Sequence, residues 1–98
     1  MPEKISASDL RAQKDDFVII DVREVDELAG GKIDGSTHMP LGLTIRNAKK
    51  KQIEDLRGKK ICTYCGTDYR GNIAADELSK EGFNAVTLEG GYPSWNPS

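Results

Sequence analysis

Short apolar segments alternate with helix-like segments along this chain, and that alternation restricts the folds it can adopt. Residues 17–20 are apolar throughout and largely β-branched, which is typical of a strand buried on both faces. Residues 60–64 and 85–88 repeat this character, whereas Asn72 to Glu81 carries its apolar residues at helical spacing. Strands that alternate with helices predict an α/β fold, with helices on both faces of a parallel sheet.

Shorter elements complete the expected order. They are a helix capped by Ser6 or Ser8, an acidic helical segment over 24–29, a strand over 37–39 and a helical turn around Trp95. The stretch 41–56 predicts a helix only in part, because Gly42 and a run of lysines interrupt its apolar spacing.

Size and charge limit the possible functions. The chain has 98 residues and a formal net charge of −2, so we expect one domain over residues 1–98 and no nucleic-acid partner. The longest apolar run is too short to cross a membrane. His38 is the sole histidine, and we expect neither a metal nor a cofactor. Two cysteines with no expected export signal indicate reduced thiols in a cytoplasmic protein.

Cys65 occupies the most informative position in the chain. It follows the strand predicted over 60–64, and a loop over 66–71 separates it from the helix predicted over 72–81. Loop amides and the positive end of a helix dipole stabilise a thiolate and make such a cysteine nucleophilic. They also form a cradle for an anion. Because parallel sheets bind ligands beyond the carboxyl ends of their strands, Cys65 marks the candidate site.

Four segments of the sequence are informative when they are considered together. They are Val18 to Glu24, the stretch from Gly31 to Leu41 with its Gly-x-Ile-x-Gly pattern, Tyr64 to Arg70, and Leu88 to Gly91 with Trp95. In this order they span nearly the whole chain and resemble a single-domain rhodanese, a sulfurtransferase. The resemblance implies a five-stranded parallel sheet flanked by helices. It places the catalytic cysteine at Cys65 and a framework pair at Asp21 and Arg23.

The same resemblance implies an active-site loop that binds the substrate. Its residues are Gly66, Thr67, Asp68, Tyr69 and Arg70. Sulfur transfer requires Cys65 to hold a persulfide, which inward-pointing amides would stabilise. Gly66 and Gly71 allow a tight loop, because glycine accepts positive φ at no steric cost, whereas Asp68 tolerates a left-handed conformation less readily. The Thr67 hydroxyl would donate to the same sulfur, and Arg70 would add a cationic fork. The donor would be a small sulfur-containing anion such as thiosulfate, or a persulfide. The acceptor would be a thiol, cyanide or a protein.

Three positions of the loop differ from the family pattern, and these differences affect which sulfur donor the site would accept. Gly66 stands where a basic residue is frequent, Asp68 where glycine is common, and Gly71 where serine is common. If Asp68 points into the mouth of the site, it repels a dianion; if it points outward, it pairs with a lysine or a partner protein. We expect weak activity with thiosulfate and better turnover with a persulfide or protein donor.

Three other interpretations remain open. Phosphatases and arsenate reductases also place a cysteine in an anion-binding loop, but the four residues between Cys65 and Arg70 form a loop one residue shorter than that of tyrosine phosphatases. A non-catalytic binding module is the second alternative, although such modules usually lack the cysteine. The third is that the chain is one domain of a larger sulfur-metabolising protein.

Several residues near the candidate site invite a simpler explanation. Cys62 lies inside a predicted strand and is expected to be a core thiol, because three residues of extended chain hold it roughly 10 Å from Cys65. His38 is expected to be a polar residue at the sheet edge. Tyr69 is expected to be exposed and to contact the acceptor. Tyr92 and Trp95 are expected to cover the sheet.

Overall fold

The computed structural model describes residues 2–96 and contains one five-stranded sheet. The strands are β1 (Glu3–Ile5), β2 (Phe17–Asp21), β3 (Thr37–His38), β4 (Lys60–Tyr64) and β5 (Asn84–Leu88). All neighbouring strands pair in parallel, in the order β1-β5-β4-β2-β3. The α/β fold with a parallel sheet is therefore confirmed.

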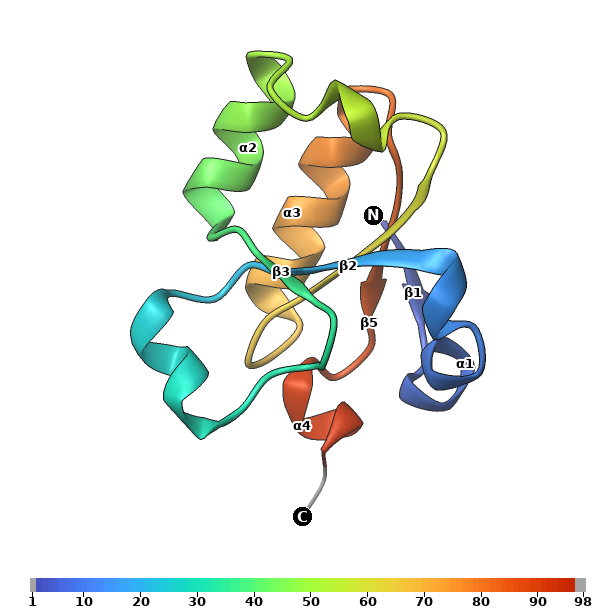
Figure 1. Ribbon diagram of the computed structural model, residues 1–98, viewed down its shortest axis with the longest axis vertical. Helices are drawn as coiled ribbons and strands as arrows, with labels where there is room; N and C mark the ends of the chain where they lie inside the picture. The colour runs from blue at the N-terminus through green and yellow to red at the C-terminus, as the bar shows by residue number, and fades with distance from the viewer. Residues whose placement is uncertain (1, 97–98) are drawn as a thin grey trace.

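Helices connect the strands and cover the sheet. The α-helices are α1 (Ala7–Ala12), α2 (Leu41–Lys49), α3 (Tyr69–Lys80) and α4 (Tyr92–Trp95), and the 3-10 segments are η1 (Lys14–Asp16), η2 (Val25–Gly30) and η3 (Glu54–Leu56). Helices α2 and α3 lie side by side (Figure 1). The elements predicted around residues 8, 27, 38 and 95 are all present, and Ser6 caps α1 by accepting a hydrogen bond from the Asp9 amide.

Two apolar layers hold the sheet, one on each face. Ile61 and Cys65 pack with α2 and α3 through Ala48, Ala74 and Leu78. The other layer joins Cys62 and Tyr64 to Leu10 of α1, with Tyr92 and Trp95 packed against it. Because successive side chains of a strand point to opposite faces, the two cysteines belong to different layers.

The structure corrects the sequence interpretation at two elements. Strand β1 was not expected, because its three residues are largely exposed and carry no apolar pattern. Helix α3 begins at Tyr69 rather than Asn72, so Tyr69 and Arg70 belong to its first turn instead of to the loop. The loop proper comprises only residues 66–68, and the helix amides therefore come closer to Cys65 than expected.

The parallel register brings the ends of β2 and β4 together. Asp21 pairs with Tyr64 at the carboxyl ends of these strands, and His38 of β3 pairs with Asp21. Cys65 follows directly after β4. None of the helices within residues 2–96 has the length and apolar character needed to span a membrane.

Candidate active site

The Cys65 sulfur lies at the N-terminal end of α3, where backbone amides point toward it. The Thr67 N–H donates to Sγ over 3.4 Å, and the Gly71 N–H donates to it over 3.3 Å. The thiol in turn donates to the Thr67 carbonyl oxygen over 2.8 Å. Cys65 has no exposed surface, yet its thiol proton and its sulfur lone pairs all have hydrogen-bond partners.

The loop achieves this geometry without the backbone conformations expected from the sequence. Gly66 and Gly71 are absent from the glycines with positive φ, and Asp68 is right-handed helical at φ −82° and ψ −21°. The loop therefore uses neither the positive φ that glycine permits nor a left-handed Asp68. A Cβ on Gly71 would instead lie 2.7 Å from Oγ1 of Thr87 and 3.3 Å from the Tyr64 Cα. Glycine therefore allows the start of α3 to approach the sheet closely enough for its amide to reach the sulfur.

Gly91 closes the site from the other side. It adopts φ +67°, and a Cβ there would lie 2.5 Å from the Thr67 carbonyl oxygen and 2.6 Å from that of Cys65. The Tyr92 N–H donates to the Cys65 carbonyl oxygen over 2.8 Å. The turn after β5 thus packs backbone to backbone on the loop that carries the thiol.

Asp68 points outward, which was one of the two orientations considered. Its Oδ1 accepts a 2.7 Å hydrogen bond from the Gly90 N–H, and its Oδ2 lies 3.9 Å from Nζ of Lys4. The carboxylate therefore ties the loop to the turn after β5. In this orientation the Asp68 carboxylate does not face the mouth of the site, so it does not repel an anion there.

Arg70 does not present a free cationic fork to the site. Its two terminal nitrogens donate to the two carboxylate oxygens of Glu27, each over 2.6 Å. Two parallel charge-assisted hydrogen bonds form the strongest common geometry for this pair of groups. The pair is partly buried, with side-chain exposures of 29% for Arg70 and 33% for Glu27. It joins the first turn of α3 to η2.

The ion pair predicts a pH dependence. The hydrogen bonds from Arg70, and then from the Glu24 backbone, lower the pKa of Glu27 from 4.5 to about 2. Since the folded value lies below the unfolded one, the contribution to stability is present above pH 4.5 and is lost as the pH falls toward 2. The difference in unfolding free energy between wild type and Glu27→Gln should shrink over that window. An NMR titration of the Glu27 carboxyl with a midpoint near its ordinary value would contradict the pairing.

A buried ion pair holds the segment that supplies Glu27. Asp21 accepts two hydrogen bonds from Nε of Arg23 and one from Nη2 at 2.7 Å. Arg23 also donates to the carbonyl oxygens of Glu27, in the middle of η2, and of Gly31, directly after it. Burial raises the pKa of Tyr64 to about 12, and its hydroxyl donates to Asp21 over 2.7 Å. The predicted framework pair of Asp21 and Arg23 is confirmed.

The remaining residues near the site have mainly structural roles. Burial raises the pKa of Cys62 to about 12, and this thiol packs in the layer opposite Cys65. Nε2 of His38 lies 2.7 Å from the Arg23 carbonyl oxygen. Tyr69 is 72% exposed, as expected, while its N–H donates to the Thr67 hydroxyl oxygen. The Thr67 hydroxyl itself is 3.9 Å from the Cys65 sulfur.

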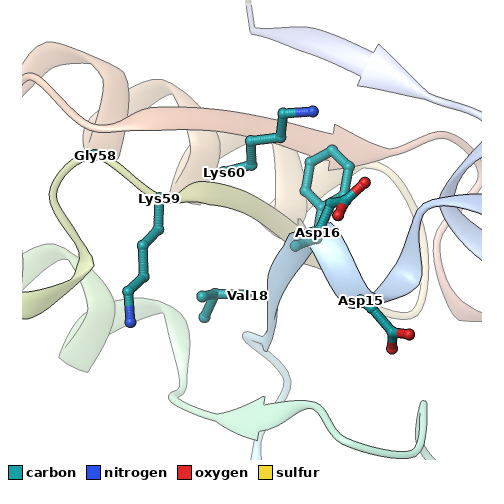
Figure 2. A pocket seen from close by; sticks show the side chains of 7 residues that line it. Asp15, Asp16, Val18, Gly58, Lys59 and Lys60 are labelled. Atoms are coloured by element: carbon teal, nitrogen blue, oxygen red, sulfur yellow. The ribbon is translucent and has the colours of Figure 1, made fainter.

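A depression lies at the opposite end of the sheet from Cys65, at the amino ends of β2 and β4. It has a volume of about 640 Å³ and is lined by residues 15–18 and 58–60. Figure 2 shows the amines of Lys59 and Lys60 directed away from each other. The depression contains no cysteine or histidine, and its charges do not converge on one point. Within residues 2–96, no group of three or more candidate ligands is arranged to hold a metal ion.

Glu27 and Gly91 are the site residues that the sequence interpretation did not identify. The spacing of Glu24 and Glu27 is that of a capping box, and both of its hydrogen bonds are present in η2. That pattern marks a helical start, but nothing local indicates that the Glu27 carboxylate reaches Arg70, 43 residues later in the chain. Gly91 belongs to one of the four segments that carried the resemblance, and its contacts explain why glycine is needed there.

Comparison with known proteins finds relatives of this chain. The chain is 35% identical over 79% of its length to YqhL of Bacillus subtilis (strain 168), of which it spans 59%. It is 28% identical over 97% of its length to the putative sulfurtransferase YtwF of the same organism, covering 82% of that protein. The chain thus spans about three fifths of YqhL.

Solved structures share the fold. A rhodanese-related protein of Thermoplasma volcanium is 34% identical with a TM-score of 0.81, and the match covers 95% of this chain and 89% of that one. A protein of unknown function from Rhodopseudomonas palustris CGA009, described as a possible tyrosine phosphatase, is 26% identical with a TM-score of 0.86, covering 98% and 80%. The model of the rhodanese-like domain matches residues 6–98. This protein therefore belongs to the rhodanese-like domain family.

Proposed function

We propose that this chain is a sulfurtransferase in which Cys65 carries the transferred sulfur as a persulfide. The observation that carries the proposal is the pair of amides, from Thr67 and Gly71, that donate to the Cys65 sulfur at the start of α3. Helix amides and the helix dipole favour a negatively charged group at that position. A thiolate and a persulfide anion both meet this requirement.

The proposed reaction has two displacement steps. In the first, the Cys65 thiolate attacks the sulfane sulfur of thiosulfate or of a persulfide, forming an S–S bond while sulfite or a thiolate leaves. In the second, a thiol, cyanide or a protein acceptor takes the outer sulfur, and the Cys65 thiolate is regenerated. Because Cys65 has no exposed surface, we expect residues 66–68 to move before the donor reaches it.

A protein acceptor fits the surface around the site. Val25 of η2 and Tyr69 of α3 are both 72% exposed, and the ion pair between Glu27 and Arg70 joins their two segments. Exposed apolar side chains gain free energy when a partner removes them from water. We infer that these two side chains contact the acceptor when sulfur is transferred to another protein.

Intact mass spectrometry after exposure to a low-molecular-weight persulfide tests the proposal. We expect wild type to gain one sulfur atom and Cys65→Ser to gain none. Cys62→Ala is the matched control, because it removes the other thiol of the chain from the opposite layer and should retain the gain.

Two results would contradict the sulfur assignment. One is a gain that persists in Cys65→Ser. The other is robust, Cys65-dependent hydrolysis of p-nitrophenyl phosphate, which would favour the phosphatase alternative. The ion pair makes that second outcome unexpected, since Arg70 is already bound to a carboxylate and is not free to hold a phosphate.

A further inference from the structure

Arg70 is one residue before Gly71, whose amide contacts the Cys65 sulfur. The Arg70 guanidinium interacts electrostatically with Cys65, and its two terminal nitrogens are already bound to Glu27, whose carboxylate lies beside Gly66. An arginine stabilises an incoming anion through the same planar fork that it uses to bind a carboxylate. Glu27 and the anion thus compete for the same donor atoms.

The carboxylate is well suited to hold the guanidinium. Glu27 lies in η2, and hydrogen bonds from Arg23 hold this segment at the Glu27 carbonyl oxygen and at that of Gly31, directly after η2. Its low pKa, about 2, keeps it charged at neutral pH. A Cβ on Gly66 would lie 3.8 Å from Oε2 of Glu27, which places the carboxylate beside the loop that carries Cys65.

We propose that Glu27 determines the charge preference of the site by withholding Arg70 from anionic donors. For its substrates, this inference rests on the proposed sulfur transfer. A thiosulfate dianion that enters the site approaches the Glu27 carboxylate, and the Arg70 guanidinium is not free to bind the dianion. A donor with no net negative charge near its sulfane sulfur meets no such obstacle. In this proposal the residue that disfavours thiosulfate is Glu27, and not Asp68 as the sequence suggested.

Alkylation of Cys65 tests the charge preference without requiring sulfur transfer. Iodoacetate is an anion and iodoacetamide is neutral, and with each of them the thiolate forms an S–C bond as iodide leaves. Both reagents need the same exposure of the buried sulfur, so the ratio of their rate constants cancels the opening of the loop. Mass spectrometry of the peptide that contains Cys65 follows each rate.

The expected result is a change in that ratio when Glu27 is neutralised. Glu27→Gln should raise the rate with iodoacetate relative to iodoacetamide by about five- to tenfold at low salt. Asp26→Asn removes the same charge from an exposed neighbour on η2 and should leave the ratio within about twofold of wild type.

Arg70→Gln separates the release of the guanidinium from simple charge repulsion. In the wild-type background it should not raise the ratio, because it frees no cation and leaves the Glu27 carboxylate without its counter-ion. In the Glu27→Gln background it should abolish the increase. A ratio that is the same in wild type and Glu27→Gln overturns the proposal. So does an increase that persists in Glu27→Gln/Arg70→Gln, because it would come from the Glu27 charge alone.

Kinetics with thiosulfate extend the test to a donor. Glu27→Gln should lower the KM for thiosulfate about five- to tenfold, and Asp26→Asn should leave it unchanged. An unchanged KM in Glu27→Gln would overturn the assignment for donors. If no variant forms a persulfide, the proposed function fails, whereas the alkylation ratios still decide whether Glu27 withholds Arg70.

Discussion

Gly91→Ala is expected to destabilise the fold by about 2–4 kcal/mol and to disrupt the site at the same time. The added Cβ would lie within 3 Å of three backbone atoms: the carbonyl oxygens of Cys65 and Thr67, and the Thr67 nitrogen. None of these atoms belongs to a flexible side chain that can move aside. The φ angle of +67° adds strain for any residue with a Cβ.

Urea unfolding measures the loss of stability, and iodoacetamide measures the loss of protection at Cys65. We expect Gly91→Ala to speed alkylation, because the loop must separate from the turn after β5. Gly42→Ala is the matched control. Gly42 lies in α2 with nothing within 4 Å of an added Cβ, so that variant should be about 0.5–1 kcal/mol more stable than wild type. Equal stability of the two variants would show that the contacts of Gly91 are not restrictive.

Sequence patterns predicted some strands of the sheet and missed another. The buried strands β2, β4 and β5 were predictable because apolar runs of that length have few alternatives in a chain of this composition. Strand β1 was not, because an exposed edge strand of three residues needs no apolar side chains. Its pairing with β5 depends on backbone hydrogen bonds that any sequence can form.

The position of Cys65 was predictable for a similar reason, since it follows from the end of β4 and the start of a helix. The state of its neighbours was not. Asp68 lies in the loop and Arg70 follows it in the first turn of α3. Both are charged and both bind residues far away in the sequence: Lys4 and Gly90 in one case, Glu27 in the other. Residue types indicate which groups can bind an anion, but only tertiary contacts determine which of them are already occupied.

The resting site is therefore more closed than the sequence implied. The sulfur has its amide donors, yet Cys65 has no exposed surface, Gly91 packs on the backbone of the loop, and the guanidinium of Arg70 is paired. Under the proposed function, this arrangement would protect the thiol between turnovers and would require a donor to displace existing contacts. Donors would then be selected by what they can displace as well as by what they can bind.

Asp21→Asn is expected to cost about 3–5 kcal/mol, because it leaves the buried Arg23 guanidinium without its counter-ion. Asp21 has no exposed surface, and Arg23 is only 4% exposed. Burial by itself would raise the pKa of Asp21, but the hydrogen bonds from Arg23 and Tyr64 outweigh it and hold the pKa below 3.8. The pair therefore contributes to stability throughout the neutral range, and the contribution is lost only as the pH falls below that value.

Removing both charges separates the cost of a broken pair from the value of the pair. The double variant Asp21→Asn/Arg23→Met buries no unpaired charge, so its unfolding free energy in urea should exceed that of Asp21→Asn alone. A double variant no more stable than the single one would show that the hydrogen bonds of Arg23 to η2 matter more than its charge. Because those bonds hold the segment of Glu27, Arg23→Met should also alter the iodoacetate-to-iodoacetamide ratio at Cys65, which links the buried framework to the charge preference of the site.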